Sequence, residues 1–161
     1  MTRLKYAEGD VFAIPLEKNG YTLGVVARTS SIGMILLGYF FDIRRETIPD
    51  AADFQNLRPE IAIWKVRIGD LHLMSGRWPI IGRIRNWNRN DWPMPKFIRR
   101  DPLTGRIKII SYKDDDPVRS KHEELVHQEH AELERDATYG AGVVEHRLSK
   151  LLNVLPKSSS G

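Results

Sequence analysis

The chain has 161 residues, a hydrophobic content of 41% and a formal net charge of +4. This length and apolar content can build one hydrophobic core, whereas a second core would be undersized. We therefore expect a single domain over residues 1–156, followed by a flexible tail over residues 157–161. The sequence contains no cysteine, which excludes a disulfide scaffold.

The start of the chain carries no targeting signal of the usual kind. Residues 1–9 lack the apolar segment of a signal peptide. The longest apolar run, residues 32–41, is far too short to span a membrane. These features predict a cytoplasmic protein with no membrane partner.

The first predicted element is a β-hairpin over residues 9–28. Apolar side chains alternate along residues 12–16 and again along residues 21–25, and the intervening Asn19-Gly20 tolerates the positive φ of a tight turn. Pro15 lacks an N–H, so the first strand is expected at the edge of a sheet.

Further strands are expected after the hairpin. A buried strand with a bend or bulge at a glycine is predicted over residues 32–42, and a helical turn over residues 48–54. In the run 61–68, alternation points Trp64, Val66 and Ile68 inward. Two more alternating runs, 78–87 and 106–112, predict strands, and residues 101–105 have the composition of a turn.

The end of the chain is predicted to be helical. Residues 118–137 are weakly amphipathic and highly charged, which indicates a solvated surface helix. A second helix should lie against the sheet and stop at Pro156. Its apolar stripe consists of Val144, Leu148, Leu151, Leu152 and Leu155.

The expected fold class is α+β and β-rich: a curved antiparallel sheet or partly open barrel built from residues 10–112, followed by two C-terminal helices. The alternating runs are joined by short turns, with few helix-length patterns between them for parallel crossovers. The predicted core consists of Phe12, Ile14, Leu23, Leu36, Trp64, Val66, Ile81, Ile109 and Leu148.

Motifs for catalysis and metal binding are weak. His122 and His127 resemble a zinc-protease motif, but at i and i+5 they would point about 140° apart on a helix. Glu123, His127 and His130 would share a helix face as a two-His-one-carboxylate set. An exposed charged face explains them better, so we expect no metal, no cofactor and no catalytic residues.

The net charge conceals two oppositely charged stretches. Residues 77–108 contain nine Lys or Arg and two acidic residues, whereas residues 114–136 contain nine acidic residues and three Lys or Arg. The two stretches either neutralise each other in the fold or form opposite faces. In the basic stretch, residues 88–95 are poor at filling a core and are expected to form a protruding loop.

Four phrases in a fixed order carry a family resemblance: residues 9–28, which include GDVFAIPL and GYTLGVVAR, then 35–42, 75–82 and 96–105. Together they resemble the immunity protein 26 family, small bacterial proteins encoded beside polymorphic toxins. The resemblance extends over residues 5–152, and residues 139–148 are similar to the closing helix of the family. Residues 86–95 depart from it because they are unusually rich in Trp, Asn and Arg.

The resemblance implies an immunity protein that neutralises a cognate toxin by stoichiometric binding. The favoured partner-binding residues are Glu123, Glu124, Glu129 and Glu132. Clustered carboxylates mimic phosphate and steer association with a cationic nuclease.

The second candidate surface is the basic segment 83–100, with Arg89, Trp92 and Lys96 as its test residues. Trp and Arg are enriched in protein–protein hot spots, and such a surface would suit an acidic toxin. The alternative function is a nucleic-acid-binding module that uses the same cations and aromatic rings. A third interpretation is that these tryptophans are structural and the arginines simply solvated.

Overall fold

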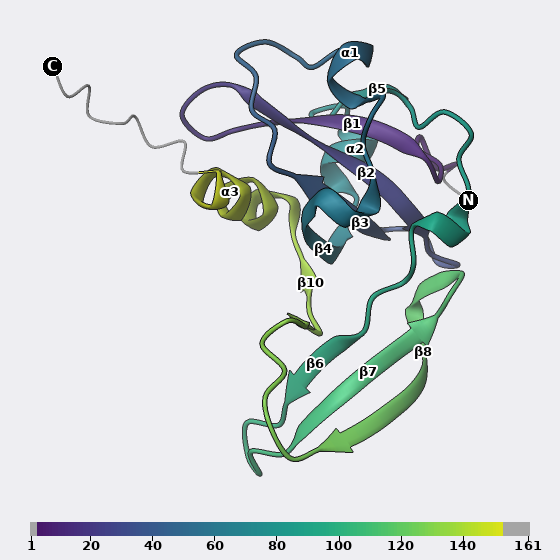
Figure 1. The fold of residues 1–161 in the computed structure, drawn as a ribbon, viewed down its shortest axis with the longest axis vertical. Coiled ribbons are helices and arrows are strands. Elements are labelled where there is room, and N and C mark those ends of the chain that lie inside the picture. Colours follow the sequence, from purple (N-terminus) through teal and green to yellow (C-terminus); the bar gives the residue numbers. More distant parts are fainter. Residues whose placement is uncertain (1–2, 153–161) are drawn as a thin grey trace, which may run out of the picture.

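The structure is a computed structural model and describes residues 3–152. Within this range ten strands form two sheets: a six-stranded sheet of order β10-β4-β3-β2-β1-β5 and a four-stranded sheet of order β8-β7-β6-β9. In Figure 1 the second sheet extends away from the first, below the helices.

The first sheet and its helices take up most of the chain. Its strands are β1 (Asp10–Pro15), β2 (Tyr21–Thr29), β3 (Ile35–Phe41), β4 (Ala62–Gly69), β5 (Ile80–Arg83) and β10 (Thr138–Tyr139). The helices are α1 (Ala51–Phe54), α2 (Leu71–Ser75) and α3 (Ala141–Leu151), with a 3-10 turn η1 (Pro59–Ile61). The second sheet contains β6 (Phe97–Arg100), β7 (Ile107–Lys113), β8 (Asp116–Val126) and β9 (Glu134–Arg135), preceded by the 3-10 turn η2 (Arg89–Asp91).

The predicted hairpin is confirmed, but its first strand is not at an edge. β1 and β2 pair antiparallel up to Pro15 opposite Tyr21, and Gly20 in the turn has a φ of +86°. β5 lies on the other side of β1 and pairs only with its first three residues. The missing N–H of Pro15 therefore costs no hydrogen bond, and the edge prediction is wrong.

Both faces of the first sheet are buried. One face packs with α2, α3 and Trp78, whereas the other packs with residues of the second sheet and of the segment before it. This explains the unbroken apolar run of β3, whose residues alternate between the two cores. In β4, Trp64, Val66 and Ile68 are buried as predicted. The other predicted core residues are buried except Ile81, which is partly exposed and packs against the second core.

The predicted helix over residues 118–137 is wrong. Residues 116–126 form β8, which pairs antiparallel with β7 across a two-residue turn, Asp114-Asp115. The helical pattern had no apolar stripe to bury, whereas antiparallel pairing with β7 provides hydrogen-bond partners along one side of the β8 backbone. Of the two expected C-terminal helices, only α3 is present within the described residues.

The sheets are mixed and open. Most neighbouring strands are antiparallel, but β10 pairs parallel with β4 and β9 pairs parallel with β6. Neither sheet closes into a barrel, so the β-rich class is confirmed but the single curved sheet or partly open barrel is not.

Two buried arginines of the first sheet hold the second sheet. Arg67 of β4 donates from Nη2 to Asp136 Oδ1 at 2.9 Å and from Nη1 to the carbonyl of Pro117 at 3.3 Å. Its guanidinium lies 4.5 Å from the ring centroid of Tyr112. Arg28 of β2 is fully buried and donates from Nε to the carbonyl of Asp114 at 2.5 Å.

Asp136 is the shared acceptor of this junction. Besides Arg67, its carboxylate accepts hydrogen bonds from Arg99 and from the Tyr112 hydroxyl, and only 1% of its side chain is exposed. Burial and the hydrogen bond to Asp136 together raise the pKa of Tyr112 to about 12. The junction therefore joins β4, β6 and β7 through one carboxylate.

Breaking this ion pair should destabilise the fold strongly. Asp136→Asn keeps the shape but leaves Arg67 buried without a counter-charge, and we expect a loss of about 3–5 kcal/mol of unfolding free energy. Urea unfolding followed by circular dichroism measures it. The matched control is Asp53→Asn, which weakens the more exposed Arg45–Asp53 pair and should cost much less, since exposed ion pairs contribute little. Equal effects of the two variants would contradict the structural role of Asp136.

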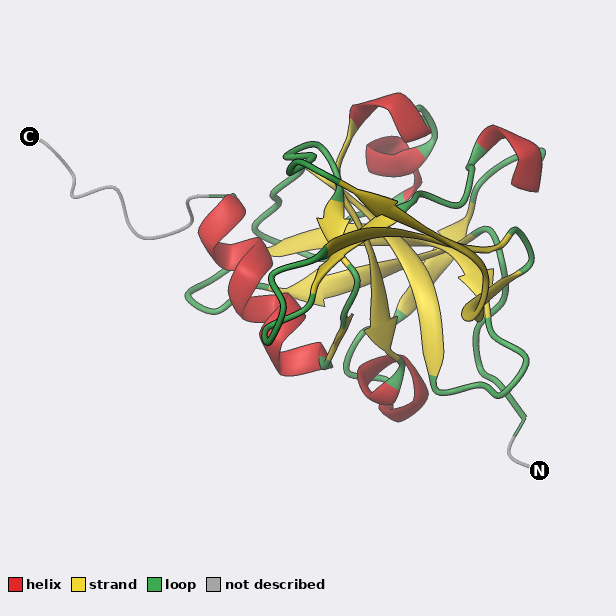
Figure 2. Cartoon of the chain, turned by 90° about the horizontal axis from the view of Figure 1, so that it is seen from below, coloured by secondary structure: helices red, strands yellow, loops and turns green. Residues whose placement is uncertain are grey.

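α3 docks on the first sheet through a buried carboxylate. Figure 2 shows the helix lying along one side of the strands. Glu145 accepts from Trp78 Nε1 at 2.9 Å and from Arg77 Nε at 2.8 Å. Val144 and Leu148 are fully buried as predicted, whereas Leu151 is 48% exposed. The expected helix positions Leu155 and Pro156 lie outside the described residues, as does the expected tail.

The pairing of Glu145 predicts an acid-sensitive contribution to stability. Burial acts to raise the pKa of Glu145, but the hydrogen bonds from Arg77 and Trp78 outweigh it and hold the pKa below its ordinary value of 4.5. A depressed carboxyl pKa stabilises the fold above the ordinary value, and this contribution is lost as the pH falls through the folded-state pKa. We expect Glu145→Gln to be less stable than the parent near neutral pH, and the difference to shrink toward about pH 3. Urea unfolding across this pH range tests it; a pH-independent difference would contradict it.

Candidate partner-binding surface

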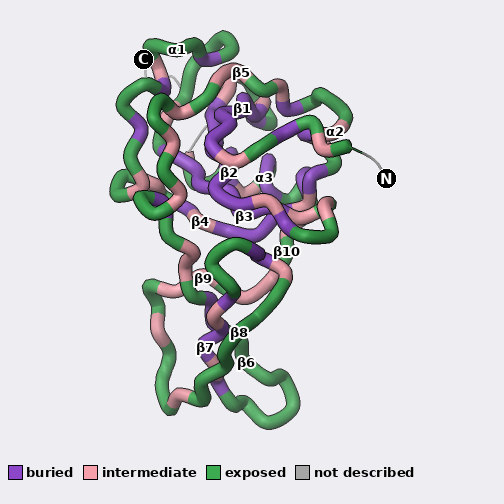
Figure 3. The backbone as a smooth tube through the Cα atoms, turned by 90° about the vertical axis from the view of Figure 1, so that its right-hand side faces the viewer, coloured by how far each residue is buried: buried purple, intermediate pink, exposed green. Residues whose placement is uncertain are grey.

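β8 is an edge strand of the second sheet and is exposed over most of its length. Its first two residues are buried against the first sheet, where Asp116 accepts from the Ser31 N–H at 3.4 Å. From Arg119 onward the strand is exposed, apart from the half-buried Val126. β7 pairs with one side of β8, and no described strand pairs with the other. Figure 3 colours the residues by burial, and most residues of β8 are exposed whereas most residues of β7 are buried or intermediate.

The strand presents its two adjacent glutamates on opposite faces. Glu123 lies opposite Ile110, and its carboxylate lies 3.4 Å from Lys108 Nζ and 3.6 Å from Arg99 Nη1. Glu124 lies opposite Ile109 on the other face and forms no ion pair with any described residue. Glu123 is therefore neutralised within the sheet, whereas the charge of Glu124 is available to a partner.

The other two predicted glutamates lie in the loop after β8 rather than on a helix. Glu129 pairs with Arg100 of β6, and Glu132 lies 3.2 Å from His130 Nδ1. A backbone hydrogen bond and the contact with His130 lower the pKa of Glu132. The acidic and basic stretches thus neutralise each other in part across the second sheet.

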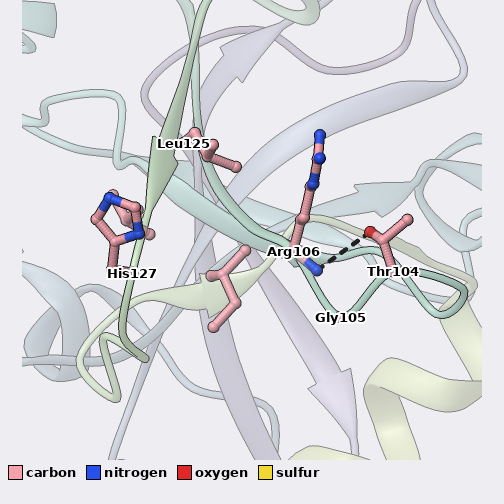
Figure 4. Close-up of a pocket in the computed structure, with 7 residues that line it drawn as sticks. Thr104, Gly105, Arg106, Leu125 and His127 are labelled. Carbon is pink, nitrogen blue, oxygen red and sulfur yellow. Dashed lines mark hydrogen bonds between the residues drawn. The ribbon is translucent and has the colours of Figure 1, made fainter.

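A pocket lies at the end of β8, at the tip of the second sheet (Figure 4). It has a volume of about 400 Å³ and lies between the turn that joins β6 to β7 and the last residues of β8. The backbone N–H of Arg106 donates to Thr104 Oγ1 at 3.2 Å and shapes that turn. The pocket is lined by Thr104, Gly105, Arg106, Ile107, Leu125, Val126 and His127. Leu125 is 50% exposed, so an apolar side chain is accessible at the open edge of the sheet.

The basic segment does not form the expected protruding loop. Trp92 is only 3% exposed, and its ring centroid lies 5.2 Å from that of Tyr39 and 5.4 Å from that of Trp87. Arg89 donates from Nε to Glu8 Oε1 at 2.9 Å. The prediction is wrong because the segment fills the space between the sheets with Trp92 and Met94. Base stacking on Trp92 is therefore blocked in this conformation.

Lys96 is exposed and lines a groove of about 430 Å³ between the sheets. Glu132 lines the same groove, so the structure brings together one candidate residue from each charged stretch. Trp64 forms its floor and donates from Nε1 to Glu134 at 2.8 Å.

The structure bears on the candidate metal ligands and on membrane-spanning helices as follows from the positions of the described residues. Glu123 lies in β8, and His127 and His130 lie in the loop after it, so the helix face on which they would gather does not exist. Within residues 3–152, no group of three or more His, Cys, Asp or Glu side chains is placed to hold a metal ion. No helix in the same range is long and apolar enough to cross a membrane.

Three of the four phrases behind the family resemblance lie in the first sheet and its connections, whereas residues 96–105 form β6 and the turn after it. A Cβ on Gly24 would lie 2.7 Å from the ring of Phe12, so this position needs glycine. Trp78 is fully buried and stacks on Phe12, with ring centroids 5.6 Å apart. Both residues support the core and neither reaches the exposed surface.

The chain belongs to the immunity protein 26 family, whose model matches residues 7–108, more than half of the chain. This confirms the resemblance over the first sheet apart from β10, over β6 and over the start of β7. The rest of the second sheet and α3 lie outside the matched range. Comparisons with curated proteins and with solved structures give no match.

The buried Trp92 and the exposed Lys96 predict a large and a small effect of substitution on the unfolding free energy. Trp92→Ala should cost about 3–5 kcal/mol of unfolding free energy because it empties part of the core. Lys96→Ala should stay within about 0.5 kcal/mol of the parent because its side chain is exposed. Urea unfolding of both variants tests this. A stable Trp92→Ala protein would show that the loop does not fill the core.

Proposed function

We propose that this chain is an immunity protein that neutralises a cognate bacterial toxin by stoichiometric binding in the cytoplasm. Membership of the immunity protein 26 family carries this proposal. The surface is suited to binding a protein, because many of its charged side chains pair with each other while Glu124 stays available to a partner. We take residues 1–156 as one domain, a view that the ion pairs of Arg28 and Arg67 with the second sheet and the segment after it support.

We further propose that the toxin binds the exposed part of the second sheet and the loop after β8, which together carry Glu123, Glu124, Glu129 and Glu132. Of these, Glu124 offers a charge that no described side chain neutralises. A carboxylate of this kind attracts the cationic clefts with which nucleases bind their substrates. β8 also lies outside the range that matches the family, where features specific to one toxin are expected.

The test uses the toxin domain encoded beside the gene for this chain. Co-expression should protect cells from this toxin, and isothermal titration should give a defined stoichiometry. We expect Glu124→Lys to weaken the complex about tenfold or more, mainly through slower association at low salt. Glu46→Lys is the matched control, since it reverses an exposed charge in the segment between β3 and α1, away from the second sheet. Absence of any complex with the parent protein would overturn the proposed function.

A further variant separates the two candidate surfaces. Lys96→Glu reverses the exposed cation of the basic segment and should leave protection intact. Protection that survives Glu124→Lys but is lost with Lys96→Glu would assign binding to the basic segment. Salt-dependent binding of oligonucleotides without toxin, weakened by Lys96→Glu, would instead favour the nucleic-acid-binding alternative.

A further inference from the structure

We propose that the free edge of β8, defined as residues His122–Val126, adds a basic strand of the toxin, so that the second sheet continues from one protein into the other. This inference rests on the proposed function and specifies how the toxin is held. Its occupant is an extended toxin segment with a cationic side chain opposite Glu124 and an apolar side chain next to Leu125.

The backbone of this segment is suited to accept another strand. Residues 122–126 pair with residues 107–111 of β7 in an unbroken antiparallel register, and the first irregularity comes between Ser111 and Tyr112. In an antiparallel pair, alternate residues direct both N–H and C=O away from the partner strand. The outer side of the free edge therefore presents unpaired donors and acceptors, which are a template for a further strand.

The side chains of the free edge define the chemistry of the added strand. Side chains directly opposite each other in a sheet lie close enough to interact. On one face, Glu123 is already balanced by Lys108 and Arg99, and Leu125 follows it beside the pocket at the sheet tip. On the other face, Glu124 has no described counter-ion, so a Lys or Arg of the toxin would pair with it. Main-chain hydrogen bonds would supply affinity, and these two positions would supply selectivity.

A second copy of this chain fits the edge less well. The two-fold symmetric arrangement that uses all of residues 122–126 is centred on Glu124. It places the Glu124 carboxylates of the two copies opposite each other, where like charges repel. Because Glu124 has no described counter-ion, it favours pairing with a basic strand and disfavours pairing with a second copy of this chain.

Amide hydrogen exchange tests main-chain pairing directly. NMR would follow the amides of residues 122–126 in the free protein and in the complex with the toxin domain. In the free protein, inward amides should exchange slowly and outward amides quickly, in alternation. In the complex, the outward amides should slow by about a hundredfold or more. A complex that leaves them fast would overturn edge pairing and leave the proposed function standing, whereas absence of a complex would overturn both.

Two further measurements complete the test. Leu125→Ala should weaken the toxin complex about tenfold, because it removes an apolar contact at the edge. Leu103→Ala removes the same atoms from a leucine that is 94% exposed but lies in the turn rather than on the edge, and it should leave affinity unchanged. Equal losses would count against edge pairing. Sedimentation of the free protein as a dimer that protects the outward amides would show that a second copy is the occupant.

Discussion

The buried ion pair between Arg67 and Asp136 is the constraint on which the arrangement of the two sheets depends. Removing both charges from water costs several kcal/mol, which their attraction and their further hydrogen bonds must offset, and the buried Nε of Arg67 has no hydrogen-bond partner among the described residues. Here Pro117 and Tyr112 contact the guanidinium, and Arg99 and Tyr112 donate to the carboxylate. These groups come from several strands of the second sheet and from the segment after β9. They can all contact Arg67 together only when the second sheet has one particular orientation on the first sheet.

This arrangement divides the molecule into a scaffold and an exposed sheet. The first sheet is buried on both faces, and it contains most of the residues that carry the family resemblance, among them Gly24 in β2, while Trp78 packs against it. The second sheet is joined to the scaffold at the Asp114–Pro117 end of its β7–β8 hairpin, while its other end extends outward (Figure 1). An exposed strand on a fixed base loses little conformational entropy on binding, which favours a rigid interface.

The sequence predicts the first half of the fold better than the second. The hairpin at Asn19-Gly20 and the inward side chains of β4 were predictable because turn chemistry and alternation are local signals. β8 was not, since charged residues occupy both of its faces and only the neighbouring β7 makes it a strand. Asp114-Asp115, which forms the turn between β7 and β8, was the signal in the sequence that could have predicted a hairpin here. Trp92 was mistaken for a surface residue because its polar neighbours hide a long-range packing role. The acidic candidates were found by charge, but their ion pairs with Arg99, Arg100 and Lys108 required the structure.

Native-state hydrogen exchange of the Asp136→Asn variant tests the central role of the buried ion pair most directly. If this pair fastens the second sheet to the first, the amides of β6 and β7 should lose more protection in the variant than those of β2 and β3 lose. Unchanged protection throughout, or an equal loss in both sheets, would contradict the account.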